Sequence, residues 1–147
     1  MDHTAGMQHL PKDICVVIGK DEPTNGLGPL FYQDNFVGVE YFNEINFDST
    51  YKLTPLGHCA DVFGDGSLWA IQTPGHRKGH ISFLINGKQD VVLITGDACD
   101  IKMGFDYCVG PGFGSYNSKK AQQSLEQLRN FANTYQQVKV FFGHELP

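Results

Sequence analysis

The chain has 147 residues, a length that fits one domain with a buried core. It is 41% hydrophobic and 18% charged, which is typical of a globular protein and not of a disordered one. The net charge of −5 and the scattered lysines and arginines argue against a nucleic-acid surface, which requires clustered positive charge. No apolar run approaches the roughly 20 residues that cross a bilayer. We therefore expect neither nucleic-acid nor membrane partners.

The cysteines predict free thiols. Cys15, Cys59, Cys99 and Cys108 show no C-x-x-C spacing. A disulfide framework is typical of short, cysteine-dense secreted chains, and this chain is neither short nor cysteine-dense. We expect a cytoplasmic protein in which Cys99 is a small buried residue.

The first 50 residues contain few regular patterns. A short helix is predicted over 4–10, where Pro11 would end it, and a buried strand over 14–19. Residues 20–48 are rich in Gly, Pro, Asn and aromatic side chains and predict a long loop with short strands. Such a loop either carries function or only connects elements, and both readings stay open.

The remainder predicts two hairpins, a helix and a last strand. Strand pairs are predicted within 60–73 and 80–97, with two-residue turns at Asp65-Gly66 and Asn86-Gly87. A helix begins at Asn117 or Ser118 and runs to about Tyr135. Its core face is marked by apolar residues at helical spacing: Ala121, Leu125, Leu128, Phe131 and Ala132. The last strand is predicted over 138–145.

Three candidate ligand residues follow predicted strands. His76 lies in a tight Pro-Gly turn, Asp97 ends a Thr-Gly-Asp sequence, and His144 lies just past the last strand. Loops at one edge of a sheet can bring such side chains together on a rigid frame. Imidazole is a preferred ligand of zinc and iron, and a carboxylate can bridge two cations. Asp2 and His3 extend the set to three histidines and two aspartates.

The joint pattern resembles the metallo-β-lactamase-fold superfamily of hydrolases. That family carries H-x-H-x-D-H, then a histidine in a TPGHTxGH-like turn, an aspartate in GD and a histidine near the C-terminus. DHTAG, TPGHRKGH, TGDA and FFGHE in this chain resemble the end of the first motif and the three that follow. The resemblance implies an α/β fold, the αββα sandwich. Residues 1–147 would form one partial domain, the end of the first half plus most of the second.

The resemblance also implies a chain truncated at its N-terminus, because the family's H-x-H pair precedes the position of Asp2. In the family, that pair forms one metal site together with the residues that correspond to His76 and Asp97. The other site corresponds to Asp2, His3, Asp97 and His144, which are all present. A partial sandwich would leave an apolar sheet face uncovered, so we expect the isolated chain to self-associate.

The chemistry implied for the intact protein uses a metal-bound hydroxide on a substrate carbonyl. Two cations, expected to be zinc with iron or manganese as alternatives, lower the pKa of the water that they share. Asp97 would bridge the cations and relay a proton to the leaving oxygen, which makes it the expected catalytic residue. The expected substrate is a small-molecule lactone, ester or thioester.

Within the superfamily, the sequence most resembles the N-acyl homoserine lactonase branch. Those lactonases carry a tyrosine three residues after the bridging aspartate, where this chain has Asp100. Asp100, Tyr107 and Tyr116 are candidates for substrate contact, and the alternative is that the loop carrying the tyrosines is a plain turn. A glyoxalase II-type thioester hydrolase, a diiron redox enzyme on the same fold and an inactive truncated metal-binding fragment remain alternatives.

Four further residues near the motifs have weaker assignments. His80 is expected behind the ligands or in packing, and His9 and His58 are expected to be surface or structural. Glu145 either orients His144, as an oxygen acceptor for its second ring nitrogen, or is a solvated glutamate.

Overall fold

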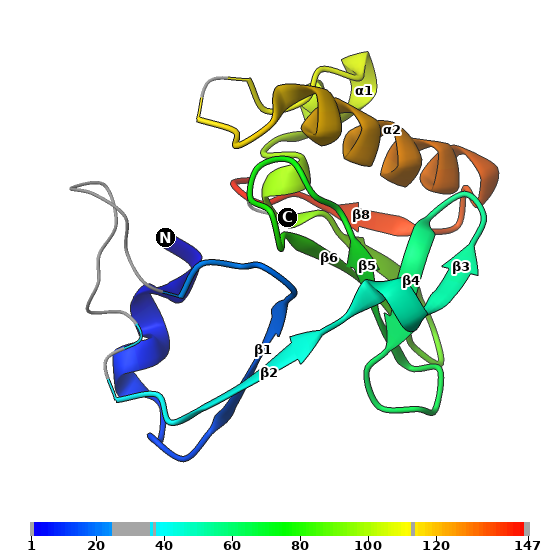
Figure 1. Ribbon diagram of the computed structural model, residues 1–147. Helices are drawn as coiled ribbons and strands as arrows, with labels where there is room; N and C mark the ends of the chain where they lie inside the picture. The colour runs from blue at the N-terminus through cyan, green and yellow to red at the C-terminus, as the bar shows by residue number, and fades with distance from the viewer. Residues whose placement is uncertain (1, 25–35, 37, 113, 146–147) are drawn as a thin grey trace.

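The computed structural model describes residues 2–24, 36, 38–112 and 114–145, which form a large sheet and a smaller lobe (Figure 1). The lobe, here called the N-terminal lobe, contains η1 (Asp2–His9), β1 (Cys15–Gly19) and β2 (Tyr41–Ile45). A short turn, η3 (Phe47–Ser49), leads from this lobe into the sheet. The site described below lies where the lobe meets the sheet.

The large sheet has six strands in the order β3-β4-β5-β6-β7-β8. They are β3 (Tyr51–Leu53), β4 (Gly57–Asp61), β5 (Leu68–Gln72), β6 (Ile81–Asn86), β7 (Val91–Ile94) and β8 (Lys139–Phe141). Neighbouring strands are antiparallel, except that β8 runs parallel to β7. A parallel pair requires a crossover connection. Here it contains η4 (Gly96–Ala98), α1 (Lys102–Tyr107) and α2 (Ser118–Thr134), and both α-helices cover one face of the sheet (Figure 1).

The core lies between this face and α2. The Asn117 side chain caps the helix by accepting the N–H of Lys120 at 3.0 Å, as the sequence predicts. Leu125 and Leu128 are fully buried in one cluster with Ile71 and Leu93 of the sheet, together with Leu56, Cys59, Leu84, Ala98, Cys99 and Phe105. The predicted helix and its core face are confirmed. Among the described residues, no helix is long and apolar enough to span a lipid bilayer.

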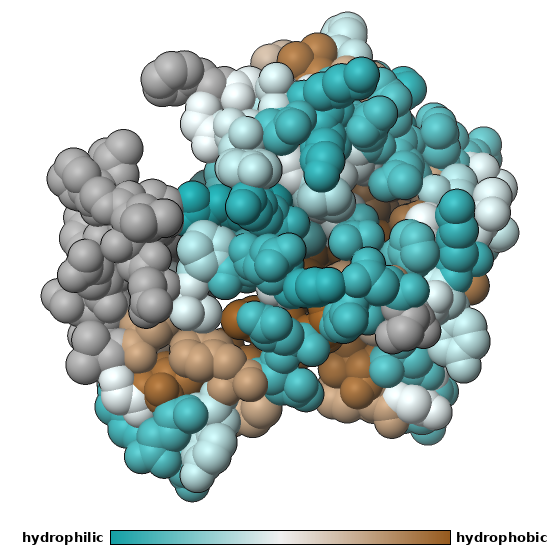
Figure 2. Space-filling view, in the orientation of Figure 1, coloured by the Kyte–Doolittle hydropathy of each residue, from teal (hydrophilic) through white to brown (hydrophobic). Residues whose placement is uncertain are grey.

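The N-terminal lobe follows the sequence prediction in outline. The strand predicted over 14–19 is β1, but it is not buried as predicted, because Cys15 and Val17 are exposed. It pairs in parallel with β2, a short strand within the segment expected to be a long loop. The helix predicted over 4–10 is present as a 3-10 helix displaced towards the N-terminus. Apolar atoms gather over the lower part of this lobe (Figure 2). Ile14, Val17 and Phe42 of the lobe are exposed. Of the loop expected over 20–48, residues 25–35 and 37 lie outside the described residues.

Both predicted hairpins are confirmed, but the predicted two-residue turns are wrong. Residues 62–67 connect β4 to β5, and the Asp61 carboxylate accepts the N–H groups of Gly64 and Gly66 at 3.0 and 2.8 Å. Residues 87–90 connect β6 to β7, where Gly87 N–H donates to the carbonyl of Asp90 at 3.0 Å. Side-chain and backbone bonds inside each loop therefore hold a wider connection than the Asp-Gly and Asn-Gly pairs suggest.

Other boundaries also differ from the prediction. The last strand ends at Phe141, because the N–H groups of Gly143 and His144 leave the ladder and donate to the carbonyls of Cys99 and Asp100. α1 lies in a segment expected to be loop, since a six-residue helix is too short to show apolar periodicity. β3 was not expected either, and it adds an edge strand to the predicted hairpin.

Truncation of Leu125 should lower the stability of the fold strongly. Leu125→Ala leaves a cavity between α2 and the sheet, and we expect it to reduce the free energy of unfolding by about 2–5 kcal/mol. Leu10→Ala is the matched control, because Leu10 is 41% exposed, and its cost should stay below about 1 kcal/mol. Urea unfolding followed by the fluorescence of Trp69, the single tryptophan, measures both. Equal losses would contradict the packing of α2 described above.

Candidate metal centre

The loop that carries His76 rests on the first turns of α2. Gly75 has φ +145°, and a Cβ at this position would lie 2.1 Å from the backbone N of Ala121. The N–H groups of Asn117 and Tyr116 donate to the carbonyls of Gly75 and His76 at 2.9 and 3.0 Å. Only glycine allows this approach of two backbones, so the Pro-Gly turn fixes where His76 lies relative to α2.

Asp97 lies in η4, directly after β7. Its backbone N–H donates to Nε2 of His80 at 3.0 Å. Thr95, two residues before Asp97, is fully buried, and its hydroxyl hydrogen-bonds the carbonyl of Cys99 at 2.9 Å. Gly96 takes a positive φ of +53°, which turns the chain so that the Asp97 carboxylate faces the N-terminal lobe. The hydrogen bond of the Asp97 backbone and the buried Thr95 beside it therefore fix the position of the Asp97 side chain.

His80 is a neutral hydrogen-bonding residue behind this turn. Because a backbone N–H can only donate, Nε2 of His80 accepts from Asp97, and the ring proton lies on Nδ1. Nδ1 lies 3.1 Å from the carbonyl of Thr73 and 2.9 Å from its hydroxyl. Burial lowers the pKa of His80 to about 4, which keeps the ring in this neutral form.

A chain of hydroxyl groups extends from His80 into the sheet. The Thr73 hydroxyl lies 2.9 Å from that of Ser82, which donates to the carbonyl of Thr95 at 2.8 Å. Since Ser82 donates to a carbonyl, it accepts from Thr73, and Thr73 in turn accepts from His80. These buried bonds tie β5, β6 and the end of β7 together beneath Asp97. Sequence reasoning missed Thr73 and Ser82, because alternation along a strand does not show which buried polar residues meet.

His144 is brought to Asp97 by a close approach at the end of β8. A Cβ on Gly143 would lie 2.7 Å from the carbonyl oxygen of Gly96 and 3.1 Å from Oδ1 of Asp97. The N–H of His144 donates to the carbonyl of Asp100 at 2.8 Å. Only glycine fits at position 143, and this close approach places His144 beside Asp97.

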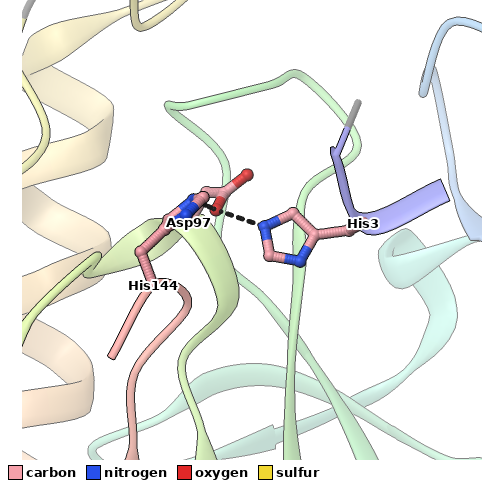
Figure 3. A group of neighbouring side chains, drawn as sticks. All are labelled: His3, Asp97 and His144. Atoms are coloured by element: carbon pink, nitrogen blue, oxygen red, sulfur yellow. Dashed lines mark hydrogen bonds and ion pairs between the residues drawn. The ribbon is translucent and has the colours of Figure 1, made fainter. Parts of the chain in front are cut away.

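Three histidines surround the Asp97 carboxylate, and they divide its two oxygens. Nε2 of His3, from η1, and Nε2 of His144 lie 2.9 and 3.0 Å from Oδ1. Nε2 of His76 lies 3.3 Å from Oδ2. The ring of His3 points towards the carboxylate across the boundary between lobe and sheet (Figure 3). The ligand atoms of His3, Asp97 and His144 all lie within 4.8 Å of one another.

The carboxylate is buried, while the histidines are accessible. The Asp97 side chain is 11% exposed, whereas those of His3, His76 and His144 are 45%, 30% and 42% exposed. Burial alone would raise the pKa of Asp97, but attraction to His3 and then His76 outweighs it and holds that pKa below its ordinary value. Asp97 is therefore a carboxylate near neutral pH, with imidazoles open to a ligand around it.

This donor set fits a divalent transition metal. Imidazole nitrogen and carboxylate oxygen are ligands that zinc, iron and manganese share. Three such atoms within 4.8 Å of one another, from His3, Asp97 and His144, can reach one ion with small side-chain movements. His76 offers a fourth nitrogen on the other carboxylate oxygen.

A cavity of about 420 Å³ opens beside this centre, between the N-terminal lobe and the sheet. His3, His76 and Asp97 line one part of it. Apolar side chains line another part, among them Val16 of β1 and Phe83 of β6. The cavity thus joins a polar, charged group to an apolar wall, which is the usual composition of a small-molecule site.

The side chain of Asp2, the remaining predicted ligand, lies outside the described part of the structure. The other predicted site residues lie away from the Asp97 carboxylate. Asp100 and Tyr107 line a separate cavity of about 420 Å³ around α1, and Tyr107 is 77% exposed. The Lys78 ammonium lies over the Tyr116 ring, with Nζ 5.1 Å from the ring centre. None of these side chains is among the described residues that surround Asp97.

Three residues with open roles can now be placed. The Glu145 carboxylate accepts the backbone N–H of Lys102 at the start of α1, a role that neither interpretation from sequence includes. His9 is exposed. Nδ1 of His58 is buried and has no hydrogen-bond partner among the described residues.

Comparison with curated proteins finds N-acyl homoserine lactonases. The chain is 36% identical over 88 residues to the lactonase AttM of Agrobacterium fabrum, covering 58% of this chain and 32% of that protein. It is 26% identical over 151 aligned positions to AttM of Azorhizobium caulinodans, covering 99% of this chain and 54% of that protein. The chain spans about half the length of this second relative. No protein-family model matches the chain.

Solved structures show the same relationship at the level of the fold. An N-acyl homoserine lactone hydrolase with N-hexanoyl-L-homoserine at its catalytic metal centre superposes with a TM-score of 0.72 and 22% identity. The match covers 97% of this chain and 51% of that structure. The chain has a partial metallo-β-lactamase fold. The expected α/β sandwich and the resemblance to the lactonase branch are confirmed, over about half of those proteins.

Gly75→Ala should lower the free energy of unfolding by more than the same substitution at a glycine whose positive φ is the only obstacle. We expect a loss of about 2–5 kcal/mol in the free energy of unfolding, because strain and overlap with Ala121 add. Gly64→Ala is the matched control, since Gly64 has φ +75° but nothing within 4 Å of the added Cβ, and should cost about 1–2 kcal/mol. Urea unfolding measures both. A smaller loss for Gly75→Ala than for Gly64→Ala would contradict the close approach.

Proposed function

We propose that this chain carries the metal centre of a hydrolase that opens small-molecule lactones or related esters. The observation that supports this most strongly is the division of the Asp97 carboxylate between histidines, with His3 and His144 at Oδ1 and His76 at Oδ2. A carboxylate with ligands at each oxygen suits two neighbouring cations, one on each side. The names of the curated relatives, N-acyl homoserine lactonases, favour a lactone as substrate.

His3, His144 and Asp97 Oδ1 would hold one cation, and His76 with Asp97 Oδ2 would contribute to the other. The side chain of Asp2 is proposed as a further ligand of the first cation. Zinc is the proposed metal, with iron or manganese as alternatives that suit the same ligands. Such cations, when bound, polarise a carbonyl and lower the pKa of bound water to near neutral.

The chain's own residues would orient this centre and the substrate. His80 holds the backbone of Asp97, so the carboxylate keeps its direction when a ligand enters. Asp97 is the proposed catalytic residue, because its carboxylate faces both the histidines and the cavity. The apolar wall near Val16 and Phe83 suits an acyl substituent of a lactone.

Zinc binding should require His3 and His144. We expect zinc to raise the melting temperature of the chain, because a ligand that binds only the folded state stabilises it. His3→Ala and His144→Ala should each reduce this rise, whereas His9→Ala should leave it unchanged, since His9 is exposed on the same 3-10 helix. Thermal unfolding with and without zinc measures the effect. An unchanged rise in both ligand variants would contradict the assigned centre.

Substrate class can be tested by assaying the zinc-loaded chain with two esters. We expect an N-acyl homoserine lactone to be opened faster than a glutathione thioester, and Asp97→Asn to abolish the opening. Proton release, followed by a pH indicator, measures the lactone, and thiol release measures the thioester. Preference for the thioester would favour a hydrolase of the glyoxalase II type. Stoichiometric zinc without hydrolysis of either would contradict the proposed activity and leave a metal-binding chain.

A further inference from the structure

A half-buried carboxylate from the N-terminal lobe contacts the loop that carries His76. Glu22 follows β1, and its Oε2 accepts the backbone N–H of Gly79 at 3.1 Å. Its Oε1 lies 3.8 Å from Nε of Arg77. Both partners belong to the loop between β5 and β6, and they flank Lys78, two positions beyond His76. Glu22 also lines the cavity beside the metal centre.

The backbones of the two segments are in close contact at the same place (Figure 1). A Cβ on Gly19 would lie 2.1 Å from the carbonyl oxygen of Gly79, and a Cβ on Gly79 would lie 2.6 Å from the backbone N of Glu22. The N–H of Glu22 donates to the carbonyl of Gly19 at 3.0 Å, which closes the turn. Two glycines therefore allow the turn after β1 to seat against the His76 loop, and the Glu22 carboxylate completes the contact.

The local electrostatics favour a positioning role over a solvated one. Burial raises the pKa of Glu22, while Arg77 and the Gly79 N–H lower it in part. Burial disfavours the charged form of Glu22, so a glutamate without a role in hydrogen bonding or packing would be more stable in solvent. The Gly79 N–H, in turn, would lose its acceptor if Glu22 were removed, and an unpaired buried N–H is costly.

We infer that Glu22 is a positioning residue for the metal centre, which fixes the His76 loop and thereby the metal affinity of the centre. The loop is held on its other side by α2 through Gly75, so Glu22 supplies the second of two supports. This inference rests on the proposed metal-binding function, and it assigns a role to a residue outside the ligand set. Groups that orient metal ligands commonly change metal affinity by about 10–100-fold when removed.

His144 and Asp97 are held by bonds that do not involve Glu22. The N–H groups of Gly143 and His144 donate to the carbonyls of Cys99 and Asp100, and the N–H of Asp97 donates to His80. Loss of Glu22 should therefore act on the metal centre through the His76 loop. General destabilisation of the fold would not be reversed by a side chain that restores only the acceptor for Gly79 N–H, which distinguishes a positioning role from a merely structural one.

Cobalt titration of the full 147-residue chain tests the inference. Cobalt(II) replaces zinc with the same ligands and reports its coordination by visible absorption. In Glu22→Ala we expect cobalt to bind about 10–100-fold more weakly than to the unmodified chain. Glu22→Gln keeps an oxygen acceptor for Gly79 N–H and should restore the affinity to within a few-fold of the unmodified chain. Glu40→Ala, an exposed carboxylate of the same lobe, should behave as the unmodified chain.

Several results would overturn the inference. They are unchanged cobalt binding in Glu22→Ala, or a loss in Glu22→Gln as large as in Glu22→Ala. Amide hydrogen exchange in the metal-free chain gives a second readout: Gly79 N–H should exchange at least about tenfold faster in Glu22→Ala, because its acceptor is gone. If the unmodified chain bound no cobalt, the proposed function would fail, and the exchange rate would still decide whether Glu22 holds the loop.

Discussion

The Asp97 carboxylate is the group on which the candidate site depends. It is buried, it is surrounded by three histidines from three separate segments, and its backbone N–H is bound by a fourth, His80. A buried carboxylate is costly unless it is paired. The imidazoles of His3 and His76 compensate for this cost and keep the pKa of Asp97 low. The same arrangement directs ring nitrogens at the two oxygens of one carboxylate, and such a cluster of nitrogen and oxygen donors can bind a cation.

Close backbone contacts provide the rigidity that such a centre needs. Gly75 against Ala121, Gly79 against Gly19, and Gly143 against Gly96 each bring two chain segments nearer than a side chain would allow. These contacts lie beside His76, Glu22 and His144 respectively. The histidines are therefore positioned by the fold at places where the sequence can tolerate only glycine. This explains why short Pro-Gly-His and Gly-His sequences after strands are informative about function.

The sequence predicts those parts of the structure that depend on local pattern. The stripe of α2, the alternation in the two hairpins and the histidines and aspartate after strands are all local, and the structure contains the helix, both hairpins and this cluster of side chains. The turns were wrong because the Asp61 side chain and the Gly87–Asp90 pair hold wider loops than dipeptide preferences indicate. Glu22 was missed because its partner Gly79 lies 57 residues away, and no periodicity links the two. Contacts of this kind depend on tertiary placement, which a single sequence does not show.

The most direct measurement is a crystal structure of the zinc-loaded chain with anomalous diffraction at the zinc edge. We expect a zinc peak about 2.0–2.2 Å from Nε2 of His3, Nε2 of His144 and Oδ1 of Asp97. A second peak towards His76 and Oδ2 of Asp97 would show that the carboxylate bridges two ions. Zinc bound elsewhere, with Asp97 still hydrogen-bonded directly to the histidines, would contradict the assignment of this site as a metal centre.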